Sequence, residues 1–440
     1  MSSSPQDPSL TKQDAKQPRA SMATKLGDAA LVGAAIFLAA VATGLVGAGL
    51  NLIIEALAEI ADLDPAARLW IAAGAGVACA LAWWWLRPLP AVNTALSLGT
   101  PLPLGRTVLD ALAQILFVGA GASLGREQAP RQVAAAVGDK IAARLHPDMR
   151  ARIVAGAAGA GLAAVYNTPC AGAIFALETL PLKRDKSFIA IATVMSFIAT
   201  FIARPITGAE AFYLVPPEKL TLALGHGLAG AMSRGTLSTL ATRQGLAQVA
   251  GLLVFLLALG LVCAVVGVGF RRLLLHRPHI PNRALTVSIP AVLVATVLVD
   301  LWLGDISGNG QAILEGLFHE PATWQVLVAL LAAKMAMTWL ALSSGATGGV
   351  LTPSLAIGGL IGALLALGAQ ALQPHLLIGV AAMTFPAAAA IGAVGVLAIT
   401  QRAPFFAIAF GLELIHAPIE LILPTLAVGL GVYAMTRRIR

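Results

Sequence analysis

Apolar residues run in long stretches along most of this 440-residue chain. A helix that spans a bilayer needs about 17–25 mostly apolar residues, and backbone that crosses lipid has to be helical. Several stretches are too long for one span and too short for two. The pattern therefore predicts an all-α membrane protein with tilted and broken transmembrane helices. The stretches lie at 29–60, 67–86, 107–124, 152–181, 187–204, 246–270, 284–303, 323–343, 350–373, 375–400 and 403–436.

Composition and charge support a polytopic membrane protein. The chain is 58% hydrophobic and 11% charged, whereas a soluble domain carries roughly a quarter charged residues. The net charge of +8 lies mostly in loops and at the two ends, with no basic stripe that could bind nucleic acid. Positive ends predict that both termini are cytoplasmic, in a plasma (inner) membrane. We expect residues 1–28 to be a polar cytoplasmic tail and 437–440 a basic C-terminus.

Motifs for other chemistries are few. The three cysteines stand alone in apolar segments, and no HExxH or Walker loop is present, so we expect no metal site, no cofactor and no enzyme. GASLG (121–125) does fit the G-x-S-x-G nucleophile elbow, which needs a strand–turn–helix context and a nearby His. Its apolar surroundings favour a membrane helix instead. An intramembrane serine hydrolase is a remote alternative.

The two halves of the chain echo each other. GLAAVYNTPCAGAIFALE (161–178) resembles VLAITQRAPFFAIAFGLE (396–413), and each has a Glu nine residues after a Pro. GASLGREQAP can be laid against GATGGVLTP, with Gly125 opposite Gly349. Corresponding interrupted segments in two halves indicate a repeat-built transporter with a site near the membrane midplane. We expect transmembrane halves at 29–204 and 246–436, joined by a linker or surface segment at 205–245.

Two of these segments are candidate anion sites. In GGVLTPSLAIGG (348–359), the glycines and Pro353 indicate a helix start, where the N–H groups of Val350 and Leu351 would attract an anion. A plain hinge between spans is the alternative. In GREQA, Gly125 precedes a second helix start at Arg126–Glu127. An ionised carboxylate there could occupy the anion site, and a protonated one would leave it. A local Arg126–Glu127 pair or an interfacial loop is the alternative.

Together these segments resemble the CLC family of chloride channels and chloride/proton exchangers over residues 29–436. That family has GREGP where this chain has GREQA, and GGxFxP where it has GGVLTP. The resemblance implies a homodimer of CLC-type inverted repeats and transport of chloride or a similar small anion. It implies that Glu127 is the gating glutamate and that the amides of Val350 and Leu351 cradle the anion. Gly125 and Gly349 would belong to the same site, with Arg126 as a structural or electrostatic neighbour.

The chain also departs from the family pattern. The first family motif, GSGIP, supplies a serine hydroxyl to the anion, but the nearest stretch here is LRPLP (86–90), so another group must line that side. Exchangers usually carry a proton-relaying glutamate where this chain has Thr179. The family's pore tyrosine lies beyond Arg440. Tyr433 is out of register and is interpreted as an interfacial aromatic, and we expect no CBS domains. A channel, an anion/proton antiporter and a fluoride/proton antiporter all stay open.

Three further charged residues lie in apolar segments. Glu178 and Glu413 end apolar stretches at mirrored positions, which favours a structural or interfacial role over transport. Lys334 would either balance the potential of the anion path or extend its amine to the membrane surface.

Overall fold

The computed structural model describes residues 22–87, 89–220, 243–278, 280–319, 322–372 and 383–439. Within these ranges the regular elements are all helical. Eight of the described helices are long and apolar enough to cross a membrane. The helices of the first half are α1 (Met22–Ala58), α2 (Pro65–Leu86), α3 (Val92–Leu98), α4 (Leu104–Gly119), α5 (Gln128–Ile141), α6 (Pro147–Tyr166), α7 (Pro169–Thr179) and α8 (Lys186–Thr207). Those of the second half are α11 (Arg243–Leu275), α12 (Leu285–Leu303), α13 (Gln311–His319), α14 (Trp324–Ser343), α15 (Leu351–Leu372), α16 (Phe385–Gln401), α17 (Pro404–Leu414) and α18 (Ile422–Thr436).

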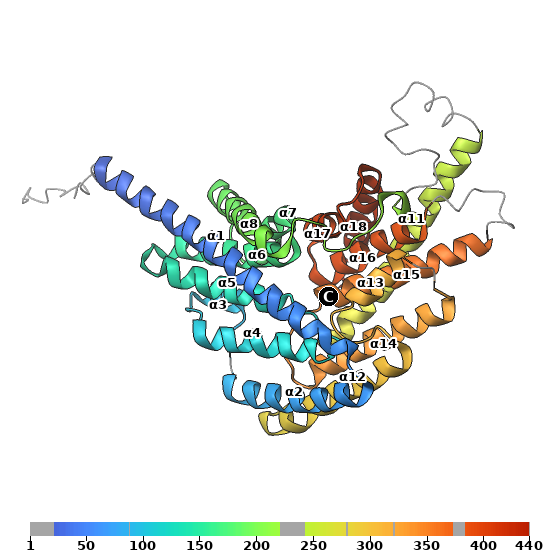
Figure 1. Cartoon of the computed structure of the whole chain (residues 1–440). Coiled ribbons are helices and arrows are strands. Elements are labelled where there is room, and N and C mark those ends of the chain that lie inside the picture. Colours follow the sequence, from blue (N-terminus) through green and yellow to red (C-terminus); the bar gives the residue numbers. More distant parts are fainter. Residues whose placement is uncertain are drawn as a thin grey trace, which may run out of the picture.

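The helices form two groups that repeat the same order of elements. In Figure 1 most of the first half, blue to green, lies on the left and most of the second half, yellow-green to red, lies on the right, with α2 and α12 together at the bottom. A long helix opens each half (α1 and α11), and each half continues through a short third helix (α3 and α13) to a broken pair (α6–α7 and α16–α17). The two halves meet antiparallel at α2 and α12, where Arg68 at the start of α2 pairs with Asp300 near the end of α12. The prediction of an inverted repeat of tilted and broken helices is confirmed.

Both broken pairs are made by the same local device. Asn167 after α6 and Arg402 after α16 each take a left-handed conformation, with φ of 54°. Two residues later, Pro169 and Pro404 occupy the first turn of α7 and α17. A left-handed residue ends a helix, and a proline is tolerated only in the first turn of the next one. The helix is therefore interrupted at the corresponding position in both halves.

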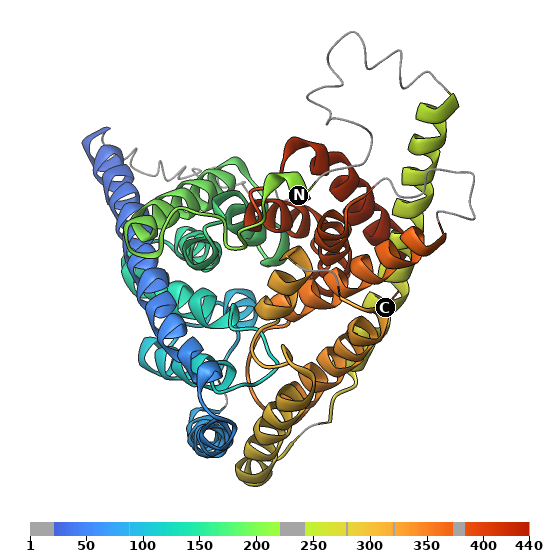
Figure 2. The same cartoon turned by 45° about the vertical axis from the view of Figure 1, so that its right-hand side comes forward.

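Short helices α7 and α17 lie side by side at the centre (Figure 2) and cap each other. The Glu178 carboxylate, at the end of α7, accepts hydrogen bonds from the backbone N–H groups of Phe405 (3.4 Å) and Phe406 (2.7 Å) at the start of α17. In return, the Glu413 carboxylate accepts from Cys170 (2.9 Å) and Ala171 (2.7 Å) at the start of α7. Both carboxylates satisfy N–H groups that a helix start leaves unpaired.

Small residues let the helices around the centre pack closely. A Cβ on Gly358 of α15 would collide with the backbone carbonyl of Gly392 on α16, and a Cβ on Gly362 with that of Ala388. Such contacts are how membrane helices associate without a hydrophobic driving force. The outer faces carry large apolar side chains instead, including Phe201 (71% exposed) and Trp302 (81% exposed). The molecule is a polytopic integral membrane protein whose closest packing surrounds α15 and α16.

The ends of the expected segments fall as follows. Helix α1 begins at Met22, so the last residues of the expected tail, 22–28, are helical. The expected linker contains the end of α8 and a 3-10 turn, Pro217–Lys219. Residues 1–21 of the tail and 221–242 of the linker lie outside the described residues.

Candidate anion-binding site

Two glycines join the two halves at the centre of the molecule. Gly125 and Gly349 exchange both backbone hydrogen bonds, each 2.8 Å from N to O, and so form an isolated antiparallel bridge. The Glu127 carboxylate lies against this bridge. A Cβ on either glycine would collide with its oxygen atoms. The absence of side chains at these two positions therefore leaves a slot that the carboxylate fills.

The carboxylate is bound at the N-terminus of α15. The backbone N–H of Leu351 donates to Oε1 of Glu127 at 2.5 Å, and the hydroxyl of Thr352 donates to Oε2 at 3.1 Å. The Glu127 side chain is fully buried. A helix start stabilises negative charge through its free N–H groups and its dipole. The Val350 carbonyl accepts from the Ser354 hydroxyl at 2.6 Å, and no described bond joins the Val350 amide to the carboxylate.

A cavity of about 330 Å³ opens on one side of this site. Arg126 lines it together with Tyr166 and Gln311, and the Arg126 guanidinium donates to Oε1 of Gln311 at 3.1 Å. The end of α1 contributes Glu55 to the same wall. Arg126 therefore points toward a water-accessible space and Gln311, while its neighbour Glu127 turns inward.

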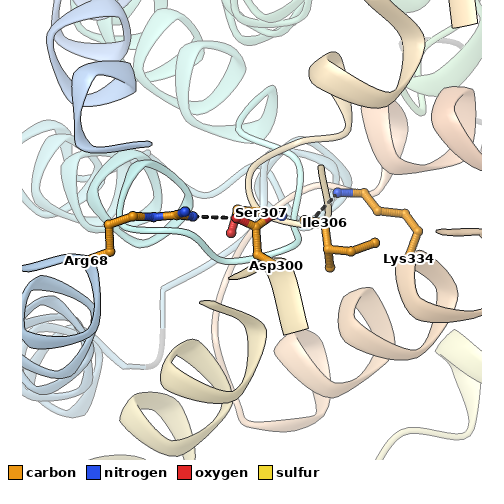
Figure 3. Close-up of polar contacts among 5 residues, drawn as sticks. All are labelled: Arg68, Asp300, Ile306, Ser307 and Lys334. Atoms are coloured by element: carbon orange, nitrogen blue, oxygen red, sulfur yellow. Dashed lines mark hydrogen bonds and ion pairs between the residues drawn. The ribbon is translucent and has the colours of Figure 1, made fainter. Parts of the chain in front are cut away.

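Buried charges hold the loop that leads into α13, the helix that begins at Gln311 (Figure 3). Nζ of Lys334 donates to the carbonyls of Ile306 (3.0 Å) and Gly308 (2.9 Å). Asp300 accepts from the backbone N–H of Ser307 at 2.7 Å and pairs with Arg68. Lys334 is fully buried, so its amine does not extend to the membrane surface. It fixes the loop between α12 and α13 instead.

A second cavity, of about 480 Å³, lies where α2 ends and α12 begins. The Arg68–Asp300 pair lies at the other ends of these two helices. Arg87, directly after α2, and Asn282, directly before α12, line it. Helix α2 has 22 residues and is therefore about 33 Å long. Gly345 and Ala346 also line the second cavity, four and three residues before Gly349. The loops that meet at the Gly125–Gly349 bridge therefore reach the first cavity through Arg126 and the second through Gly345 and Ala346.

Three residues at the site were not expected from sequence. Thr352 binds the carboxylate directly, although threonine in an apolar helix gives no signal of this role. Arg131 donates to the backbone carbonyl of Glu127 at 2.9 Å and lies over the Phe175 ring at 4.9 Å. Its spacing of four residues from Glu127 on a helix was a usable signal. Tyr166 closes the wall of the first cavity and packs against Phe410.

The remaining expected site residue lies apart from the carboxylate. The Thr179 hydroxyl donates to the backbone carbonyl of Phe175 within its own helix, at 2.7 Å. Ser123 of the GASLG stretch lies in a loop between helices, where its hydroxyl is 3.4 Å from that of Thr338. The strand that a nucleophile elbow requires does not precede Ser123 in the described chain.

A helical bundle of inverted repeats, with an acidic side chain bound at an intramembrane helix start, defines a class of membrane transport proteins. Known proteins place the chain within this class. A family model described as voltage gated chloride channel matches residues 78–437. The chain belongs to this family, the CLC family.

Individual relatives agree with this assignment. A ClcB-like chloride channel protein of Ralstonia nicotianae is 30% identical over 69% of this chain and 65% of its own length. The H(+)/Cl(-) exchange transporter ClcA of Cronobacter sakazakii is 31% identical over 71% of this chain and 63% of its own length. The matches thus span slightly less than two thirds of each relative. Among solved structures, a slow cyanobacterial Cl-/H+ antiporter shares the fold, with a TM-score of 0.75 and 22% identity over 92% of this chain and 94% of its own.

Proposed function

We propose that this chain moves chloride, or a similar small inorganic anion, across the membrane, and that Glu127 is its gate. One observation carries the proposal. The buried Glu127 carboxylate is bound by the Leu351 amide and the Thr352 hydroxyl at the start of an apolar helix long enough to cross a membrane. A group that binds a carboxylate in this way also binds a small anion.

The gate works by competition between two negative charges for one site. While Glu127 is ionised, its carboxylate fills the slot beside Gly125 and Gly349 and blocks the passage. Protonation removes the charge that the helix start attracts, so the side chain leaves and the anion takes its place. Arg126, at the wall of the first cavity, raises the local concentration of anions at that entrance.

Exchange of the anion for protons is the first form of this proposal. It is supported by the position of an ionisable group directly in the anion path, and by the name of the ClcA relative. A cavity of about 180 Å³ beside Glu127, lined by Asn93, Gln128 and Arg131, has room for several waters that could carry protons. A channel is the second form, and Thr179 favours it, because a hydroxyl does not relay protons as a carboxylic acid does.

Flux from liposomes tests the proposal. Purified protein is reconstituted, and release of chloride or fluoride is recorded together with external pH for wild type and Glu127→Gln. We expect anion release coupled to proton movement in wild type, and loss of the proton movement in Glu127→Gln. Glu55→Gln is the matched control, because it removes a carboxylate from the cavity that Arg126 lines without touching α15.

The outcomes separate the alternatives. Anion release without any pH change selects the channel. Coupled release of fluoride but not chloride selects the fluoride/proton antiporter. If wild type releases neither anion, the transport proposal is wrong and the hydrolase alternative returns.

We further propose that both termini are cytoplasmic, in a plasma (inner) membrane, and that the protein is a homodimer. The positive ends of the chain support the first statement, and the family resemblance supports the second. Protease access to each terminus in oriented vesicles tests the topology. The mass of the protein in detergent, measured by light scattering, tests the dimer.

A further inference from the structure

Four acidic side chains are buried in the part of the chain that the structure describes: Asp110, Glu127, Asp139 and Asp300. Asp139 and Asp300 each pair with an arginine, and Glu127 is the proposed gate. Asp110, on α4, is 3% exposed and forms no ion pair within the described residues. A buried carboxylate without a counter-ion is costly, and binding a proton is one way to remove its charge. Asp110 is therefore the buried acid that still needs a role.

Two cations close to Asp110 are bound elsewhere. Arg106 lies one turn before Asp110 on α4, and its guanidinium donates to the last backbone carbonyl of α2. Arg87 attracts the Asp110 carboxylate, yet its guanidinium donates to the backbone carbonyl of Gly345. Arg87 also lines the second cavity, together with Arg277. Asp110 therefore lies next to the wall of the second cavity and has no cation bound to it.

Two side-chain donors hold the Asp110 carboxylate. The indole N–H of Trp83 donates to Oδ1 at 2.8 Å, and the Gln114 amide donates to Oδ2 at 2.7 Å. The same Gln114 nitrogen donates to Oε1 of Gln132 at 2.9 Å. Gln132 lines the third cavity, the one of about 180 Å³ that Arg131 also lines. Two consecutive hydrogen bonds thus lead from Asp110 to the wall of the third cavity.

The Gln114 amide suits both protonation states of Asp110. Its Oε1 is buried and has no hydrogen-bond partner within the described chain. With Asp110 ionised, the amide nitrogen donates to Oδ2. With Asp110 protonated, a half turn of the amide would make Oε1 the acceptor of the new O–H group. Gln132 would follow with the same half turn, because its own amide nitrogen could then donate to Oε1 of Gln114.

The internal repeat sets Asp110 against Lys334. Asp110 precedes Gly125 and Lys334 precedes Gly349 by the same 15 positions, and the two glycines form the central bridge. The Lys334 amine donates to two backbone carbonyls, which accept a hydrogen bond in one way only. Asp110 is bound instead by amide side chains that can turn. The corresponding positions therefore differ: Lys334 fixes a loop, whereas the surroundings of Asp110 allow it to gain and lose a proton.

We propose that Asp110 is a proton-binding residue that passes the exchanged proton between the second cavity and the third. This inference rests on the proposed function in its exchanger form. A proton from water in the second cavity binds Oδ2 of Asp110, and the Gln114 amide turns. The carboxyl group then releases the proton to water in the third cavity and becomes a carboxylate again, and that water protonates Glu127. The amides of Gln114 and Gln132 orient the water and do not take up the proton.

Loss of the carboxyl group at position 110 tests the relay in liposomes. Anion release and proton movement are recorded for wild type, Asp110→Asn, Asp110→Glu and Asp139→Asn. Asp139 is the matched control, because it is also a buried aspartate but pairs with Arg150 at a different cavity. We expect Asp110→Asn to lower the ratio of protons moved to anions released about tenfold or more, while anion release continues. Asp110→Glu should keep proton movement, and Asp139→Asn should leave the ratio unchanged.

The ratio of protons to anions separates a relay from a structural role. Equal losses of anion release and proton movement in Asp110→Asn would mean that Asp110 only supports the fold. An unchanged ratio in that variant would mean that protons take another route. Either result overturns the proposal, and so does anion release without proton movement in wild type.

Infrared spectroscopy separates this inference from the proposed function, because it needs no flux. Difference spectra between acidic and neutral pH are recorded for purified Glu127→Gln that carries isotope-labelled aspartate. We expect the C=O band of one buried carboxyl group to appear reversibly in acid, to shift with the label, and to be missing from Asp110→Asn. That band supports proton binding at Asp110 even if liposomes release no anion. If wild type exchanges anions for protons and no such band appears, the proposed function stands and this inference is wrong.

Discussion

Thr352→Val isolates the hydroxyl that binds the Glu127 carboxylate, the gate proposed above. The substitution preserves the shape of the side chain and removes one of the two hydrogen bonds to the Glu127 carboxylate, the one of 3.1 Å. A hydrogen bond to a charged group contributes about 1.5–3 kcal/mol, and its length places this one near the lower end. A loss of about 1.5 kcal/mol lowers the equilibrium constant for binding of the carboxylate in the slot roughly tenfold. An external anion then displaces the gate at about one tenth of the concentration.

The assay is the chloride concentration that gives half-maximal flux, measured in both the wild-type and the Glu127→Gln background. We expect Thr352→Val to lower that concentration up to tenfold in wild type. It should not lower that concentration when residue 127 carries no charge, because the competition has then been removed. A decrease of equal size in the two backgrounds would refute the competition argument.

Other substitutions test the remaining parts of the site. Gly349→Ala places a Cβ against the carboxylate, so flux should lose its dependence on pH, with no further change on adding Glu127→Gln. Lys334→Met leaves two loop carbonyls unpaired and should lower stability in detergent by about 2–4 kcal/mol, visible as a lower melting temperature. Glu178→Gln and Glu413→Gln should each cost about 1 kcal/mol by the same measurement. Clearly unequal losses of stability in the two variants would contradict the interpretation that Glu178 and Glu413 cap α17 and α7 equivalently.

Much of the architecture could be predicted because it is encoded in local backbone chemistry. The prolines at 169 and 404 and the glycines at 125 and 349 specify where helices start and where chains approach closely. These features survive in the sequence because few other residues tolerate such positions. The pairing of Gly125 with Gly349, suggested by laying the two halves over each other, is a direct contact in the structure.

The remaining features of the site depend on contacts between segments that are far apart in the sequence, and such contacts leave no local pattern. Arg87 and Arg277 lie 190 positions apart and become neighbours only because α2 ends where α11 ends. Lys334 is the single charged residue of an apolar helix. Its sequence context therefore could not show whether its amine binds the loop between α12 and α13 or extends to the membrane surface. Thr352 is unremarkable in sequence and binds the gate only because α5 and α15 begin at the same point.

The capping of α7 and α17 limits how a proton can reach the gate. Both oxygens of Glu178 accept backbone N–H groups of α17, and both oxygens of Glu413 accept those of α7. Protonation of either would sacrifice a hydrogen bond at a helix start, so neither is suited to carry protons during transport. Thr179, the neighbour of Glu178, bonds within its own helix. We propose that, if proton exchange is observed, the proton reaches Glu127 through water in the cavity lined by Gln128 and Arg131, a route that needs neither carboxylate. Filling that cavity should then abolish proton movement and spare anion flux.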